Sequence, residues 1–154
     1  MGPDDGHMFA WGADINGPPG ETCNGCTSVD QDIHLLTSFT GDNDMTALTT
    51  NQSTLTASTN IEMHEFAVAN VGKRVIILFS SDLATASVSD LTLDLADWNG
   101  PSVSISAYRF ATQGPEAISV TPATETVTVA PLTINIPVTL DGHDALLIFI
   151  DGST

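Results

Sequence analysis

Hydrophobic and polar residues alternate along much of the second half of the chain. In LTLDL, residues 91–95, the three leucines share one face, and VSISAYRF, residues 103–110, alternates in the same way. A period of two is typical of a strand with one buried face. By contrast RVIILF, residues 74–79, is apolar after its arginine, as expected of a central strand covered on both faces.

Short extended segments of this kind recur from residue 61 to the C-terminal end. Turn signals separate several of them, at Val71–Lys73, Trp98–Pro101, Gln113–Pro115 and Asp141–His143. Short strands with turns between them and no helical pattern predict an all-β fold, an antiparallel β-sandwich of the Ig-like or jelly-roll-like kind with about seven to nine strands. The predicted strands are Ile61–Asn70, Arg74–Ser80, Val88–Leu95, Val103–Phe110, Ile118–Val129, Leu132–Leu140 and Ala145–Ile150.

The first 60 residues have a different character. Glycine, proline, asparagine and aspartate are frequent, and residues 14–25 form a loop by composition. QDIHLLTSF, residues 31–39, fits either a strand or a helical turn. We therefore expect one structural domain, with residues 1–60 as a loop-rich extension packed on a sandwich core of residues 61–154.

The charge of the chain is strongly one-sided. Three Lys and Arg residues face 19 Asp and Glu residues, which gives a net charge of −16. Such a surface repels nucleic acids and anionic membranes, so neither is an expected partner. This charge is compatible with the binding of cations, with neutral ligands such as sugars, and with a salty or extracellular setting. The simplest explanation is that the negative charge keeps the protein soluble.

Two cysteines lie close together in TCNGC. One CxxC is half of a zinc site, and the Asn-Gly between Cys23 and Cys26 is turn chemistry, so we favour a small loop disulfide over two free thiols. A disulfide implies an oxidising compartment, and we expect a secreted, extracellular protein. The start of the chain has no signal-peptide pattern, which fits either a mature or excised piece of an exported protein or a protein that does not leave the cell by the usual route.

Three long segments together resemble a known family. MHEFAVANVGKRVIILFSSD, DLTLDLADWNGPSVSISAYRF and PLTINIPVTLDGHDALLIFID resemble the β-sandwich that follows the catalytic barrel in several families of glycoside hydrolases. The resemblance covers about residues 63–151 and implies a non-catalytic module that accompanies a carbohydrate-active enzyme.

Candidate ligand-binding residues follow from the chemistry of sugar recognition, in which aromatic rings stack on a pyranose face. Trp98 and Asn99 lie in a turn, Trp11 in an apolar run, and Tyr108 in a strand where it fits the sheet surface as well as a ligand site. The plainer interpretations are that Trp98 caps the core and that Trp11 belongs to it.

Acidic residues supply the candidate metal ligands. Asp30 and Asp32 alternate with His34, so on a strand they would share a face, and Asp42 and Asp44 lie in a polar loop. Loop carboxylates suit a structural calcium, although a solvated acidic face is the simpler interpretation. Zinc is less expected, because the histidines follow no ligand spacing.

Taken together, these features predict a carbohydrate-associated module that binds a glycan or stabilises a catalytic domain. The five glutamates show no catalytic pairing and no Gly-x-Ser-x-Gly elbow exists, so independent hydrolase activity is the third choice. The second is a self-assembling subunit of an extracellular fibre or a virion shell. Expected partners are a polysaccharide, a catalytic domain or further copies of the chain.

Overall fold

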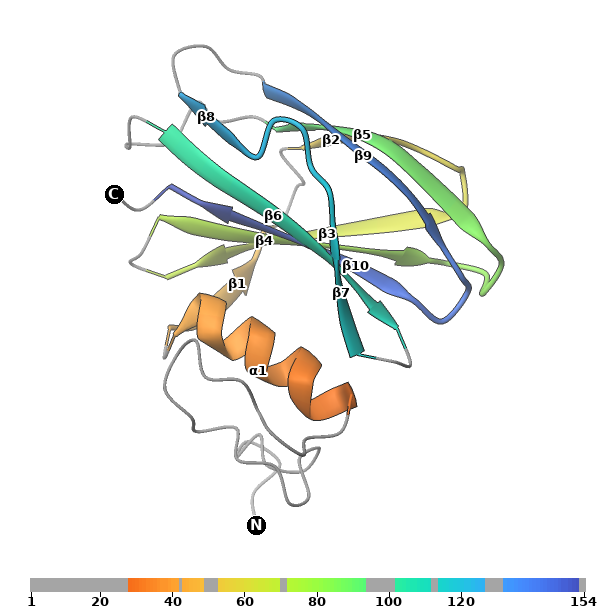
Figure 1. Ribbon diagram of the computed structural model, residues 1–154, viewed down its shortest axis with the longest axis horizontal. Coiled ribbons are helices and arrows are strands. Elements are labelled where there is room, and N and C mark those ends of the chain that lie inside the picture. The colour runs from red at the N-terminus through yellow and green to blue at the C-terminus, as the bar shows by residue number, and fades with distance from the viewer. Residues whose placement is uncertain are drawn as a thin grey trace.

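The computed structural model describes residues 28–41, 43–48, 53–69, 72–93, 102–111, 114–126 and 132–152. Two antiparallel sheets and one helix make up this part of the chain (Figure 1). The elements are α1 (Ser28–Thr40), β1 (Met45–Ala47), β2 (Thr54–Ala57), β3 (Ile61–Val68), β4 (Lys73–Ser80), β5 (Ala86–Leu93), β6 (Ser102–Ala111), β7 (Gly114–Ile118), β8 (Thr124–Thr126), β9 (Leu132–Leu140) and β10 (Ala145–Asp151). The predicted all-β antiparallel sandwich is confirmed.

The larger sheet has the strand order β1-β3-β4-β10-β6-β7, with β8 also paired to β6, and the smaller sheet has the order β2-β5-β9. Strands β3 and β4 form the hairpin that the sequence predicts, and Gly72, with φ of 60°, lies in the reversal between them. A left-handed backbone at this position favours glycine because a Cβ atom would be strained there. The first 60 residues contribute α1 and one strand to each sheet.

Strand β4 buries side chains on both of its faces, as its apolar sequence predicts. Ile76 and Leu78 pack in the core between the two sheets. Val75 and Ile77 point to the opposite face, where α1 covers the larger sheet. The larger sheet is thus the middle layer, and its central strands are apolar because both of their faces are covered.

Helix α1 resolves the ambiguity of residues 31–39. Leu35, Leu36 and Phe39 pack on the larger sheet, and this spacing gives a helix one apolar stripe. The helix ends at Gly41, whose φ is 62° and whose N–H donates to the Thr37 carbonyl at 2.8 Å. A glycine in the left-handed conformation is a common helix terminator.

Lysine 73 holds the C-terminal end of α1 against the larger sheet. Its Nζ donates to the Phe39 carbonyl at 3.0 Å, lies 4.8 Å from the centre of the Phe39 ring and 3.4 Å from an Asp151 carboxylate oxygen. A cation is favourable at a helix C-terminus because the unpaired carbonyls there carry partial negative charge. The contact therefore combines an ion pair, a cation–π contact and a helix cap.

A buried ion pair lies between the two sheets. Arg74 Nη1 is 3.0 Å from Glu65 Oε1, and the side chains are only 6% and 0% exposed. The Glu65 carboxylate also accepts from the N–H and the hydroxyl of Ser53, at 3.2 and 3.0 Å. Because Ser53 directly precedes β2, this pair links the larger sheet to the smaller one.

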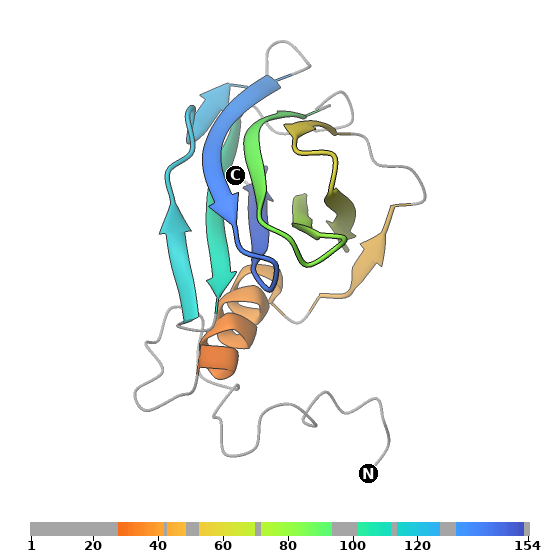
Figure 2. The same ribbon diagram turned by 90° about the vertical axis from the view of Figure 1, so that its right-hand side faces the viewer.

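Arginine 109 makes a second link between the sheets. Its Nη1 donates to the Thr139 carbonyl of β9 at 3.3 Å, and its Nη2 pairs with Glu116 of β7. Nearby, the backbone of Asn135 in β9 exchanges hydrogen bonds of 2.8 and 3.1 Å with Thr121. Pro137, between these two β9 positions, has no N–H to offer to another strand. Figure 2 shows β9 and the β7–β8 segment side by side along this closed side.

One predicted strand is wrong in its extent. Instead of one strand over residues 118–129, β7 ends at Ile118, a single bridge forms at Thr121, and β8 spans Thr124–Thr126. Pro122 interrupts the segment because it has no N–H for a strand ladder. The predicted turn signal at Gln113–Pro115 falls at the reversal between β6 and β7, where Ala111 is opposite Gly114, although Gly114 and Pro115 already belong to β7.

We expect the replacement Arg74→Ala to lower the free energy of unfolding by about 3–5 kcal/mol, because it leaves the Glu65 carboxylate buried without its cation. The double replacement Glu65→Met/Arg74→Met should lose clearly less, since no charge is then left unpaired. Urea unfolding measures both. A single replacement that costs less than about 1 kcal/mol would show that the pair is not buried as described.

Candidate functional site

The sequence-predicted site residues fall into three groups in the structure. Trp11, Cys23, Cys26, Asp42, Trp98 and Asn99 lie outside the described residues, so their predicted roles stay predictions. Asp30 and Asp32 belong to α1, where residues two apart point in different directions, so the shared face expected of a strand does not form. The side chains of Asp30 and Asp32 lie outside the description.

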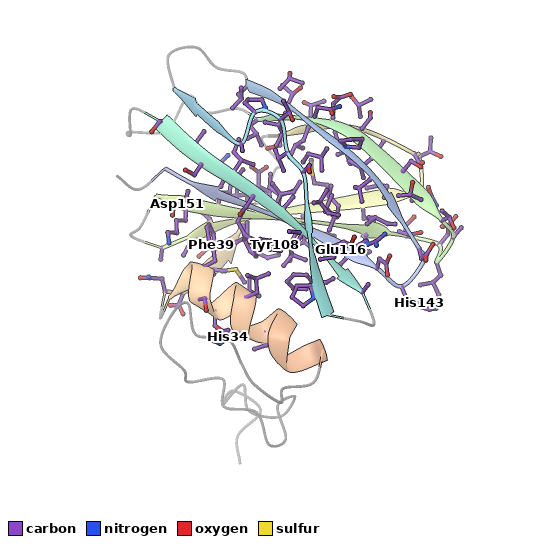
Figure 3. The ribbon with its side chains drawn as sticks, in the orientation of Figure 1. His34, Phe39, Tyr108, Glu116, His143 and Asp151 are labelled. Atoms are coloured by element: carbon purple, nitrogen blue, oxygen red, sulfur yellow. The ribbon has the colours of Figure 1, made fainter. Side chains whose placement is uncertain are left out.

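Two further predicted residues are described. Tyr108 is half-buried beneath α1, with its ring 5.8 Å from that of Phe149 (Figure 3), so it lines the sheet surface. Its role in ligand binding stays a prediction. Asp44 is exposed beside β1. No group of three or more His, Cys, Asp or Glu side chains within the described residues could hold a metal ion.

The described residues place polar loops and exposed rings together at one end of the sandwich, which we call the loop end. It comprises the turn at residues 58–60, the loop at 81–85 and the loop at 141–144. In Figure 3, His143 marks this end, and Asp151 lies toward the opposite end. The strand register brings the loops together, because Ile61 is opposite Ser80 and Phe79 is opposite Ala145.

Asp82 organises the loop between β4 and β5. One of its carboxylate oxygens, Oδ1, accepts from Asn60 Nδ2 at 2.9 Å, from the Ser80 hydroxyl at 2.9 Å and from the Ala84 N–H at 3.1 Å. These donors, with the Asn60 side chain the largest cause, lower the pKa of Asp82 from its ordinary 3.8. Hydrogen bonds to the charged form stabilise it, so the network is strongest when Asp82 is ionised.

Leu83 lies at the tip of this loop in an unfavourable conformation. Its φ is 60° and its side chain is 65% exposed. Gly142 in the β9–β10 loop lies directly against it, since a Cβ atom at residue 142 would be 1.6 Å from the Leu83 carbonyl oxygen. The two loops therefore fit together only because residue 142 is glycine.

An aromatic pair of an exposed histidine and a half-buried phenylalanine lies next to the loop end, on the same sheet face as α1. The rings of His64 in β3 and Phe79 in β4 are nearly parallel, with an angle of 4° and centroids 5.5 Å apart. Glu62 is directly opposite Phe79 in the register, and its Oε2 lies 3.4 Å from His64 Nε2. The side chains of His64 and Glu62 are 53% and 51% exposed. We call Glu62, His64 and Phe79 the aromatic platform.

The platform was missed in the sequence although its signal was present. His64 and Phe79 are far apart in the chain and meet only through the register of the β3–β4 hairpin. The turn at Gly72 was predicted, and pairing the two strands outward from it places Glu62 near Phe79. Sequence reasoning considered the two strands separately and so lost this diagonal contact.

The other described glutamates are less suited to catalysis. Glu65 is buried and neutralised by Arg74, so it offers no accessible acid or base. Glu116 pairs with Arg109. Glu62 is thus the glutamate of the platform that is exposed, while Glu65 and Glu116 are each held by an arginine.

Comparisons with known proteins add little beyond this. No protein-family model and no curated protein matches the chain. Two solved structures are similar in part. One is CelM2, a bifunctional glucanase-xylanase from a metagenome library, with 11% identity, a TM-score of 0.37 and coverage of 61% of this chain. The other is a GH30 endoxylanase from Clostridium papyrosolvens, with 16% identity, a TM-score of 0.33 and coverage of 65%. The aligned part spans 16% and 22% of those chains.

Among the described helical residues, no segment has the length and apolar character needed to span a membrane.

The pKa of Asp82 predicts a specific acid sensitivity. Because the folded-state pKa is below the ordinary 3.8, the contribution of Asp82 is complete well above pH 3.8 and is lost as the pH falls through the folded-state value. Asp82→Asn should make the unfolding free energy depend less on pH as the pH is lowered from about 5 into this acidic range. Urea unfolding across this range tests it. The control is Asp44→Asn, which removes a negative charge at an exposed position outside the network. If both variants reduce the pH dependence of the unfolding free energy equally, the prediction is contradicted.

The strain at Leu83 gives a second prediction. Leu83→Gly should raise the free energy of unfolding by about 0.5–1 kcal/mol, because glycine adopts a positive φ without steric cost. Leu83→Ala is the matched control, since it removes the same exposed side chain but keeps the Cβ atom. Thermal and urea unfolding should rank the glycine variant above the alanine variant, and the reverse order would show that the loop is unstrained.

Proposed function

We propose that this domain is a non-catalytic, carbohydrate-associated module that binds a glycan at the aromatic platform. The observation that carries the proposal is the parallel His64–Phe79 ring pair, in which His64 is exposed and Phe79 half-buried, with the exposed Glu62 beside it. Sugar rings bind to proteins by placing their apolar face on an aromatic ring while neighbouring polar groups hydrogen-bond the hydroxyls. The platform supplies both kinds of contact on one sheet face.

The setting of the platform favours a pre-formed binding surface. Its residues lie on two neighbouring strands of the larger sheet rather than in a loop, and Phe79 is also opposite Ala145 of β10. Strands hold side chains in place before a ligand arrives, so little conformational freedom is lost on binding. The ordered loop of Asp82 directly follows β4 and provides polar groups at the rim.

The rival role as a self-assembling fibre or shell subunit receives less support. Strand pairing between copies needs a free strand edge, and the edge along β9, one of the two edges of the smaller sheet, is occupied by the Thr121 bridge, Pro137 and the Arg109 hydrogen bond. We accordingly favour glycan binding, with stabilisation of a neighbouring catalytic domain as the companion role.

We expect the purified protein to migrate more slowly in native gels that contain a bound polysaccharide, tested with a panel of xylan, glucan, mannan and soluble chitin derivatives. Phe79→Leu and His64→Gln keep the bulk of each side chain but remove an aromatic ring, and each should weaken binding about five- to tenfold. Leu83→Ala is the matched control, since it removes an exposed apolar side chain at the same end. Unchanged migration across the panel, or equal loss in the control, would contradict the proposal.

A further inference from the structure

We infer that the aromatic platform selects glycans by charge, preferring sugars that carry an ammonium group and rejecting those that carry carboxylate or sulfate. The inference rests on the proposed function and defines the chemical class of its ligand. Two independent observations support it: the position of Glu62 on the platform and the use of every lysine and arginine elsewhere in the fold.

The chain has three Lys and Arg residues, and all three are within the described part. Each is already paired with a carboxylate: Lys73 with Asp151, Arg74 with Glu65 and Arg109 with Glu116. Recognition of a uronate or a sulfate normally uses an arginine or lysine that is available to the ligand. A glycan with such groups would have to break one of the three contacts that hold the layers together.

The platform itself offers the opposite chemistry. The Glu62 carboxylate is half exposed and directly opposite Phe79, and side chains in such register-paired positions lie about 5 Å apart. A cation near a ring face gains cation–π attraction, and a neighbouring carboxylate adds an ion pair. An amino sugar stacked on Phe79 would therefore place an ammonium at its rim within reach of Glu62.

The long-range field acts in the same direction. The 19 acidic residues outnumber the three Lys and Arg residues by 16, so the chain has a net charge of −16. At about 0.15 M salt this field is screened over roughly 8 Å, so it attracts any cation weakly and without regard to site. The test must therefore separate the local effect of Glu62 on an ammonium group from the general attraction of cations by the net negative charge.

The test compares three hexasaccharides by isothermal titration in about 0.15 M NaCl, at a pH where the sugar amine is protonated. Glucosamine and N-acetylglucosamine hexamers share a ring and differ in charge, and the galacturonate hexamer is anionic. We expect the glucosamine hexamer to bind about two- to fivefold more tightly than its acetylated counterpart, the range that an exposed ion pair supports, and the galacturonate hexamer not to bind.

Variants locate the preference. Glu62→Gln should bind both glucosamine-based hexamers equally, while Asp44→Asn, which removes the same charge at an exposed position beside β1, should keep the preference. His64→Phe keeps a ring without an ionisable group and should keep it as well. Equal affinities in the unmodified protein, galacturonate binding, or a loss of preference that is as large in Asp44→Asn as in Glu62→Gln would overturn the inference.

Failure of the inference can be told apart from failure of the proposed function. If the acetylated hexamer binds and Phe79→Leu weakens it, but no charge preference is present, the platform binds glycans and only the selectivity is wrong. If neither that hexamer nor any polysaccharide of the panel binds in a way that depends on Phe79, the proposed function is wrong and the selectivity falls with it.

Discussion

The double-sided burial of β4 is the constraint on which the rest of the structure depends. A strand with apolar residues on both faces is stable only if a layer covers each face. The smaller sheet covers Ile76 and Leu78, and α1 covers Val75 and Ile77. Both covers include residues from the first half of the chain, namely α1 and β2, so the regular strands after residue 60 do not complete the fold alone.

The three basic residues secure these layers in a chain that otherwise repels itself. Lys73 fixes the end of α1, and Arg109 donates to the Thr139 carbonyl of β9 in the smaller sheet. Arg74 pairs with Glu65, whose carboxylate in turn accepts from the Ser53 hydroxyl next to β2. Two of the three lie side by side at the start of β4. The acidic surface and the few cations thus have distinct roles, because the cations are placed where layers meet rather than spread over the surface.

Much of the fold could be predicted from the sequence because the deciding signals are local. Alternation identifies β6 and β9, the apolar run identifies β4, and glycine marks the reversal before it. The helix remained ambiguous because Leu35, Leu36 and Phe39 give too short an apolar pattern to separate a helix from a strand. The interruption at Pro122 was missed because the alternation of the threonine-rich segment outweighed the missing N–H of one proline.

The candidate site was harder to predict because it depends on pairing between distant residues. Neither His64 nor Phe79 belongs to a motif, and tryptophan in a turn is the more familiar sign of sugar binding. What makes these two rings a surface is the diagonal step across the β3–β4 hairpin. Glu65 and Arg74 also meet only through a diagonal contact across this hairpin, on the opposite face of the sheet. There the interior requires their charges to neutralise each other.

The two diagonal pairs of this hairpin connect its interior face to the proposed binding face. Inside the sandwich, Glu65 and Arg74 fix β3 against β4 through a contact that excludes water. That contact holds the register, and the register in turn sets the spacing between His64 and Phe79 on the other face. A one-residue slip would send every side chain of a strand to the opposite face and put charges into the core, so the buried pair resists it. The rigidity that the proposed glycan stacking would require is thus supplied by the interior of the same hairpin.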